Sequence, residues 1–96
     1  MKINILRSAR NELEDGYLFY ESCEEGVGEY FLRSLHADIL SLKPIAGGHQ
    51  IINGYFRKHA SRFPHSIFYK IEENEVRIYA VIDQRRDPEW ISERLN

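Results

Sequence analysis

Apolar residues recur at helical spacing through the first part of the chain. The first stripe consists of Ala9, Leu13, Tyr17 and Tyr20. Their separations of four, four and three positions predict one face of a helix that ends near Glu24. Ser8 stands just before this pattern, where a residue with a side-chain oxygen is expected to cap the helix N-terminus. Gly16 interrupts the helix, and we expect it to allow close packing there.

A second helical stripe follows after a short break. It consists of Val27, Phe31, Leu35, Ile39 and Leu42. Gly26 and Gly28 separate it from the first stripe, and Pro44 with the Gly47-Gly48 pair predicts its end. Two amphipathic helices joined by a short glycine-containing turn are typical of an antiparallel helical hairpin. The aromatic residues in the two stripes are best explained by packing in a core.

The periodicity of the apolar residues changes to two after Gly54. The strands that this alternation predicts are Tyr55–His59, Ser66–Glu72 and Val76–Ile82, with a further short strand from Lys2 to Leu6 at the N-terminus. Glu73-Asn74 provides a two-residue hairpin turn in which Asn can adopt positive φ. One face of the last strand is expected to carry Val76, Ile78, Ala80 and Ile82. The three later strands should therefore form an antiparallel meander.

Asp87-Pro88 predicts the start of a final helix that runs through Leu95, because Asp is a favoured N-cap and Pro a favoured first helical residue. The expected order is β-α-α-β-β-β-α. We therefore predict a small α+β fold in which a helical hairpin packs on a curved antiparallel sheet. Residues 1–96 are expected to form a single domain.

The charged residues are unevenly distributed along the chain, although the net charge is only −2. Seven acidic residues and no Lys or Arg lie between Glu12 and Glu29. The stretch from Gly54 to Lys70 holds two Arg, two Lys and two His, and no acid. One interpretation is a dipolar surface that meets an anionic partner on one side. The alternative is that both are simply solvated faces.

The sequence lacks the motifs of several large functional classes. It contains no phosphate-binding glycine loop, no dinucleotide fingerprint and no nucleophile elbow. No two of the four histidines are four residues apart, so we expect neither a metal site nor a cofactor. The single cysteine, Cys23, excludes an internal disulfide. No membrane-spanning segment or signal peptide is predicted, which favours the cytoplasm and no membrane partner.

Basic side chains on the predicted sheet are the main candidates for a functional site. Arg57 and His59 are two residues apart and should project from one face of their strand. Arg62 lies in the following connection, and Arg85-Arg86 follow the last strand. The planar guanidinium fork of Arg is suited to phosphate groups. It also remains open that these cations only solvate the sheet and pair with the acidic helices.

Four segments in order carry a resemblance to a known family. They are GYFR at 54–57, RFPHSIFYKI at 62–71, VRIYAVI at 76–82 and RRDP at 85–88. Together with the upstream helical hairpin and its Leu40 to Pro44 ending, they resemble the ParE/RelE superfamily of type II toxin–antitoxin toxins, also known as plasmid-stabilisation proteins. The resemblance covers essentially the whole chain. It implies a toxin that a cognate antitoxin neutralises.

The resemblance implies two alternative activities. ParE-like members inhibit DNA gyrase and are not nucleases, whereas RelE-like members cleave mRNA on the ribosome. Arg57, His59 and Arg85 match basic positions of the nucleases, with Arg62 as a further phosphate contact. Ser66 and Ile91 depart from the nuclease pattern, and Asp83 stands where some nucleases have histidine. The ParE-like alternative is therefore favoured over an mRNA endonuclease.

If the chain is a nuclease, the resemblance implies Arg57, His59, Arg62 and Arg85 as catalytic residues. In the ParE-like case, the residues implied for binding are Arg57, Arg62, Arg85, Arg86 and Trp90. The expected partners are a cognate antitoxin and DNA gyrase, or the ribosome and mRNA in the alternative. A homodimer is also plausible, because Tyr55, Phe56, Phe68 and Tyr79 would leave aromatic surface exposed. A third alternative is a family member that binds its antitoxin but is no longer toxic.

Overall fold

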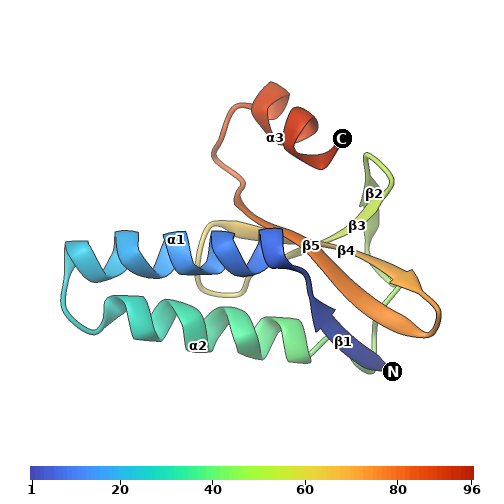
Figure 1. Cartoon of the computed structure of the whole chain (residues 1–96), viewed down its shortest axis with the longest axis horizontal. Helices are drawn as coiled ribbons and strands as arrows, with labels where there is room; N and C mark the ends of the chain where they lie inside the picture. The colour runs from blue at the N-terminus through green and yellow to red at the C-terminus, as the bar shows by residue number, and fades with distance from the viewer.

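A computed structural model describes residues 1–96 as a helical hairpin, a five-stranded sheet and a C-terminal helix. The elements are β1 (Lys2–Ile5), α1 (Arg7–Cys23), α2 (Val27–Leu40), β2 (Gln50–Ile52), β3 (Tyr55–His59), β4 (His65–Glu72), β5 (Glu75–Asp83) and α3 (Pro88–Leu95). The strand order is β1-β5-β4-β3-β2. β1 runs parallel to β5 and all other pairs are antiparallel. The hairpin lies on one side of the sheet and α3 on the other (Figure 1).

Residues of the predicted helical stripes pack against β4 and β5 to form the main core. Its buried residues are Ala9, Leu13, Phe31, Leu35, Ile39, Leu42, Ile67, Tyr69, Val76, Ile78 and Val81. Close approach of α1 and α2 depends on two glycines, as expected for Gly16. A Cβ at Gly16 would lie 2.5 Å from the Phe31 ring, and one at Gly28 would lie 2.6 Å from a backbone oxygen of α1. Only glycine therefore fits at these points of the helix–helix contact.

Two tight turns shape the sheet. Glu73 and Asn74 both have positive φ, 53° and 59°, which confirms the predicted hairpin turn between β4 and β5. Asn53 and Gly54 repeat this geometry between β3 and β2. The strand β2 was not predicted, because its three residues are too few to display a period of two. The Asn-Gly pair that follows it was the available signal.

A β-bulge in β5 corrects the predicted face of that strand. Phe68 pairs with Ala80 but Tyr69 pairs with Ile78, so Tyr79 is an extra residue opposite β4. The bulge shifts the alternation by one position. The four residues predicted to share one face are therefore divided. Val76 and Ile78 face the helical hairpin, whereas Ala80 and Ile82 face α3, where they pack with Phe68 and Leu95.

The two predicted helix caps have different outcomes. Asp87 caps α3 as predicted, since its carboxylate accepts a hydrogen bond from the Glu89 N–H at 3.1 Å. Ser8 does not cap α1, which begins at Arg7 after Leu6. The Ser8 hydroxyl instead donates to the backbone oxygen of Tyr79 at 2.9 Å, where β5 extends beyond its β1 partner. None of the helices has the length and apolar content needed to span a membrane.

Candidate functional site

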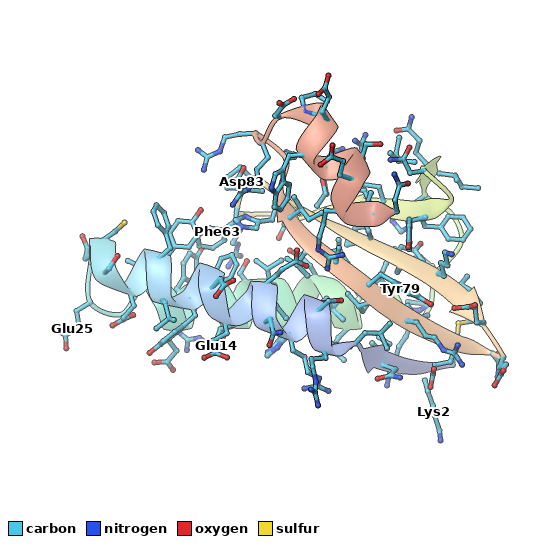
Figure 2. All side chains as sticks on the ribbon, turned by 45° about the horizontal axis from the view of Figure 1, so that its top comes forward. Lys2, Glu14, Glu25, Phe63, Tyr79 and Asp83 are labelled. Atoms are coloured by element: carbon cyan, nitrogen blue, oxygen red, sulfur yellow. The ribbon has the colours of Figure 1, made fainter.

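A cleft of about 780 Å³ lies between α1, the end of β5 and α3. Its lining comprises Glu12, Asp15, Gly16, Phe19 and Tyr20 of α1, His65 of β4, Val81, Ile82 and Asp83 of β5, then Arg85, Arg86, Asp87, Trp90 and Arg94. Three of the predicted binding residues, Arg85, Arg86 and Trp90, therefore share one cavity. In Figure 2, Asp83 marks the point where β5 runs into the segment that leads to α3.

Arg85 is held at the mouth of this cleft by Asp83. Its Nε and Nη2 atoms donate to the two carboxylate oxygens of Asp83 at 3.0 and 2.7 Å, and its backbone N–H donates at 2.9 Å. The side-chain hydrogen bonds from Arg85 are the main reason that the pKa of Asp83 lies below its usual value. The same bonds raise the pKa of Arg85. Asp83 thus neutralises Arg85 rather than acting as a free base.

Arg86 differs from Arg85 because it makes no ion pair. Its guanidinium carbon lies 4.0 Å from the centroid of the Trp90 ring, a close cation–π contact. Trp90 keeps 39% of its surface exposed, and Phe19 of α1 keeps 59%. The cleft therefore combines one unpaired cation with two accessible aromatic rings, a composition that is enriched at protein–protein contacts.

The Tyr20 and His65 side chains form the inner wall of the cleft on the hairpin side. Their ring centroids are 6.2 Å apart, and both rings pack against Phe31. Burial lowers the pKa of His65, outweighing the opposite effect of Asp83, and burial also raises the pKa of Tyr20. His65 Nδ1 is buried without a hydrogen-bond partner. The inner wall is therefore uncharged at neutral pH.

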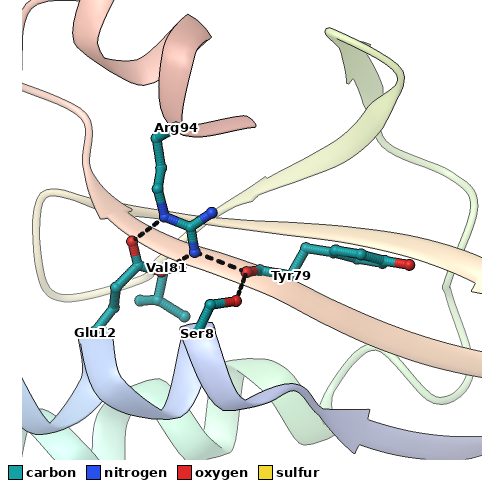
Figure 3. A network of polar contacts seen from close by, with 5 residues as sticks. All are labelled: Ser8, Glu12, Tyr79, Val81 and Arg94. Carbon is teal, nitrogen blue, oxygen red and sulfur yellow. Dashed lines mark hydrogen bonds and ion pairs between the residues drawn. The ribbon is translucent and has the colours of Figure 1, made fainter. Parts of the chain in front are cut away.

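A polar network joins α3 to α1 at the far end of the cleft (Figure 3). Arg94 donates from Nε and Nη2 to the Glu12 carboxylate at 2.9 and 3.0 Å, and from Nη2 to the Tyr79 oxygen at 3.0 Å. Glu12 also accepts the Val81 N–H at 3.0 Å. These bonds give hydrogen-bond partners to the Val81 N–H and the Tyr79 carbonyl oxygen on the edge of β5. They also fix the position of α3, and with it the position of Trp90.

Arg57 and His59 lie on the sheet face that carries α3, since their cross-strand partners are Phe68 and Ser66. Their placement on one face was predicted. Arg57 Nη2 donates to Gln50 Oε1 at 3.1 Å, while its Nε is buried without a partner. His59 Nδ1 lies 2.6 Å from Gln84 Oε1, and because that oxygen only accepts, Nδ1 carries the proton.

Arg62 does not join Arg57 on that face. It lies in the loop between β3 and β4, on the side of α2, with its guanidinium 5.9 Å from the centroid of the Tyr30 ring. Ser66 and Ile91, the two positions that depart from the nuclease pattern, both make contacts inside the fold. Ser66 is 1% exposed and donates to Gln84 Oε1 at 2.9 Å, and Ile91 packs against the cluster beneath α3.

Sequence reasoning missed the cleft residues contributed by α1 and β4. Phe19 and Leu18 fall outside the predicted stripe of α1, and both are exposed. Large apolar residues off the buried face of a helix were a signal that this helix contributes to a contact surface. His65 carried no such signal, because its place beside Asp83 follows from the pairing of β4 with β5.

The architecture of this chain is also found among solved structures. No protein-family model matches the sequence, and no curated protein does. A chain of the solved structure "Chromosomal ParDE TA system from P. aeruginosa" superposes with a TM-score of 0.78. The protein has a ParE-like fold. The match covers 86% of this chain and 95% of the other at 16% sequence identity. It confirms the ParE-like fold that the sequence resemblance implied.

Proposed function

We propose that this protein is the toxin of a type II toxin–antitoxin pair, that a cognate antitoxin neutralises it, and that the free protein inhibits DNA gyrase. The observation that carries the proposal is the fold, which matches a chain of a ParDE toxin–antitoxin system over nearly its whole length. The four sequence segments that resemble ParE/RelE toxins also support it, because this resemblance lies in the residues themselves and not in the shape of the fold.

The contact surface proposed for the target is the cleft between α1 and α3. Trp and Arg are the residues that most often dominate the energetics of protein interfaces, and Arg86 stacked on Trp90 provides both. Replacing Arg86 and Trp90 together by Ala should weaken gyrase inhibition by at least about tenfold, the equivalent of roughly 1.4 kcal/mol. The double variant R86A/W90A is compared with R7A, which removes an exposed arginine from the start of α1.

The test of the proposal is a supercoiling assay with purified gyrase, run beside a cleavage assay on translating ribosomes with the same protein. Inhibited supercoiling with intact mRNA is the expected result. Induced expression in a bacterium should stop growth and produce filaments, and co-expression of the antitoxin should restore growth. Unaffected supercoiling at a large excess of folded protein would contradict gyrase as the target.

An mRNA endonuclease is the second candidate, supported by the environment of His59. Gln84 holds the proton on Nδ1, which leaves Nε2 free to accept a proton on the same sheet face as Arg57. In that case replacing Arg57 and Arg85 by Ala should abolish cleavage. Undiminished cleavage by this double variant would refute the phosphate roles of Arg57 and Arg85.

The third candidate, a protein that binds its antitoxin without being toxic, is separated from both by expression alone. Growth that continues unchanged while the folded protein accumulates would exclude the gyrase and nuclease proposals together. Co-purification with the antitoxin would then support the third candidate. The exposed aromatic surface that suggested a homodimer is not found, because Phe68 is buried beneath α3 and Tyr55, Phe56 and Tyr79 are only partly exposed. Light scattering of the same preparation, with and without antitoxin, measures the oligomeric state.

A further inference from the structure

A second cavity, of about 420 Å³, lies between α2 and the loop that joins β3 to β4. It is lined by Tyr30, Arg33, Ser34, Ala37, Ser61 and Arg62. None of these residues lines the cleft between α1 and α3. The cavity contains Arg62, which the sequence had suggested for a different surface, and Arg33, which the sequence had not singled out.

The loop that forms one wall of this cavity is anchored to α2 by a buried carboxylate. Both oxygens of Asp38 are used for the anchor, since they accept the Ser61 N–H and the Ser61 hydroxyl, each at 2.9 Å. Asp38 is only 8% exposed. Two bonds to the residue before Arg62 hold the loop against the helix. The Arg62 guanidinium is therefore kept over Tyr30 and close to the helix turn that carries Arg33.

The two arginines of this cavity have no acidic partner. Every ion pair in the protein involves Arg77, Arg85 or Arg94. The carboxylate of Asp38, which holds the loop next to Arg62, is already bonded through both oxygens to Ser61. Both guanidinium groups are therefore free of ion pairs, although the chain carries a net charge of −2. They create a local positive potential suited to an anion.

Ser34 adds a buried hydrogen-bond donor at the same place. The residue is 7% exposed, and its hydroxyl has no hydrogen-bond partner. Serine in the interior of a helix commonly bonds to the carbonyl one turn earlier, but Ser34 does not. Buried polar atoms in proteins are nearly always bonded. An oxyanion that enters between the two arginines and displaces the atoms covering Ser34 Oγ would give this hydroxyl an acceptor.

We propose that Arg33, Arg62 and Ser34 form a site for a carboxylate side chain of an acidic protein segment. A carboxylate accepts charge-assisted bonds from two guanidinium groups and a hydroxyl at once. The exposed Tyr30 ring, 41% accessible, offers apolar contact to the neighbouring residue of such a segment. The acidic residues Glu25 and Glu29 at the start of α2 disfavour a long polyanion, such as nucleic acid, that would run past them.

The test uses the intact protein and three probes of defined chemistry. These are the peptide acetyl-Gly-Leu-Glu-Glu-Leu-Gly-amide, the same peptide with Gln in place of Glu, and tetrathymidylate. Binding is followed by NMR through the arginine Nε–H signals and the backbone amides. The Glu peptide should shift the signals of Arg33, Arg62 and Ser34, and the Gln peptide should leave them in place.

Three variants locate the binding. R33Q/R62Q should reduce affinity for the Glu peptide by about a hundredfold, because each charge-assisted bond is worth roughly tenfold or more. S34A should reduce it several-fold, and the matched control R7Q should leave it unchanged. All are exposed positions except Ser34, whose variant removes an unbonded hydroxyl, so each should fold with an unaltered circular dichroism spectrum.

Equal affinity of R33Q/R62Q and the unmodified protein for the Glu peptide would overturn the proposal. Tetrathymidylate that binds at these residues as tightly as the Glu peptide would overturn it too, in favour of a nucleic-acid phosphate. Because the readout involves neither gyrase nor growth, the result is independent of the function proposed above.

Discussion

Replacing Glu12 by Ala tests whether the bonds between α1 and α3 hold the cleft together. Glu12 accepts the Val81 N–H and two bonds from Arg94, with only 18% of its side chain exposed. A buried N–H left unbonded costs about 1–3 kcal/mol. Loss of the partly exposed ion pair adds roughly 1 kcal/mol, because Arg94 keeps its bond to the Tyr79 oxygen. We therefore expect E12A to lower the free energy of unfolding by about 3 kcal/mol.

The assay is urea and thermal unfolding followed by circular dichroism. A loss of about 3 kcal/mol should lower the Tm by roughly 12–24 °C in a domain of this size. The control is E14A on the same helix, an exposed glutamate without hydrogen bonds, which should change stability by less than about 0.5 kcal/mol. R94A should cost less than E12A, roughly 1.5 kcal/mol, because Glu12 still binds Val81.

A double-mutant cycle of E12A and R94A separates the two contributions of Glu12. The coupling between the two side chains should be about 1 kcal/mol, and the remainder of the E12A effect should persist in the R94A background. An E12A variant as stable as E14A would refute the reasoning. So would a coupling of zero, since the Glu12–Arg94 contact would then contribute nothing to the position of α3.

Three further perturbations have directions set by the structure. Because burial lowers the pKa of His65, folding favours its neutral form, so its contribution to stability is complete above about pH 6.5 and decreases as the pH falls below that value. H65F should lose this part of the pH dependence of stability, measured by urea unfolding at pH 7.5 and 5. If the pH dependence of H65F were unchanged, it would have to come from groups other than His65. R85A should raise the pKa of the Asp83 carboxyl towards its usual value, measured by carbon-13 NMR titration, and an unmoved midpoint would contradict the hydrogen-bonding cause. G28A should lower the free energy of unfolding by about 1–3 kcal/mol, because its Cβ would lie 2.6 Å from a carbonyl oxygen of α1. The control G48A should be tolerated, because its Cβ would lie 3.4 Å from the nearest atom, the Ile45 carbonyl oxygen.

The helices, the meander and the last helix could be predicted because each leaves a local signal. Most residues of the two apolar stripes are buried as their spacing predicts, but Tyr17, Tyr20 and Val27 are only partly buried. The helix α2 itself ends at Leu40, and turns follow it. Asp87 is recognisable as a cap from the proline beside it. The strand β2 is three residues long, which is too short for periodicity, and only the turn after it was visible in the sequence.

The arrangement of the site could not be predicted, because it depends on contacts between distant residues. The bulge at Tyr79 lies within an unbroken alternation of residues, yet it moves Asp83 to the hairpin side of the sheet, next to His65. Arg62 is placed by the bonds between Ser61 and Asp38, which are 23 residues apart in sequence. Neither contact has a local motif, so the sequence indicated neither the position of Asp83 beside His65 nor that of Arg62 beside α2.

The resulting distribution of arginines supports recognition of partners more than cleavage of RNA. Phosphodiester cleavage needs cations that converge on one point and are not already neutralised. Of the four residues named for cleavage, Arg85 is neutralised by Asp83, Arg62 lies with α2, and only Arg57 and His59 share a face. Separate basic positions, each next to accessible aromatic rings such as Trp90 and Tyr30, are instead suited to several protein contacts. This arrangement of arginines is therefore better suited to the protein contacts that the proposed function requires than to cleavage of RNA.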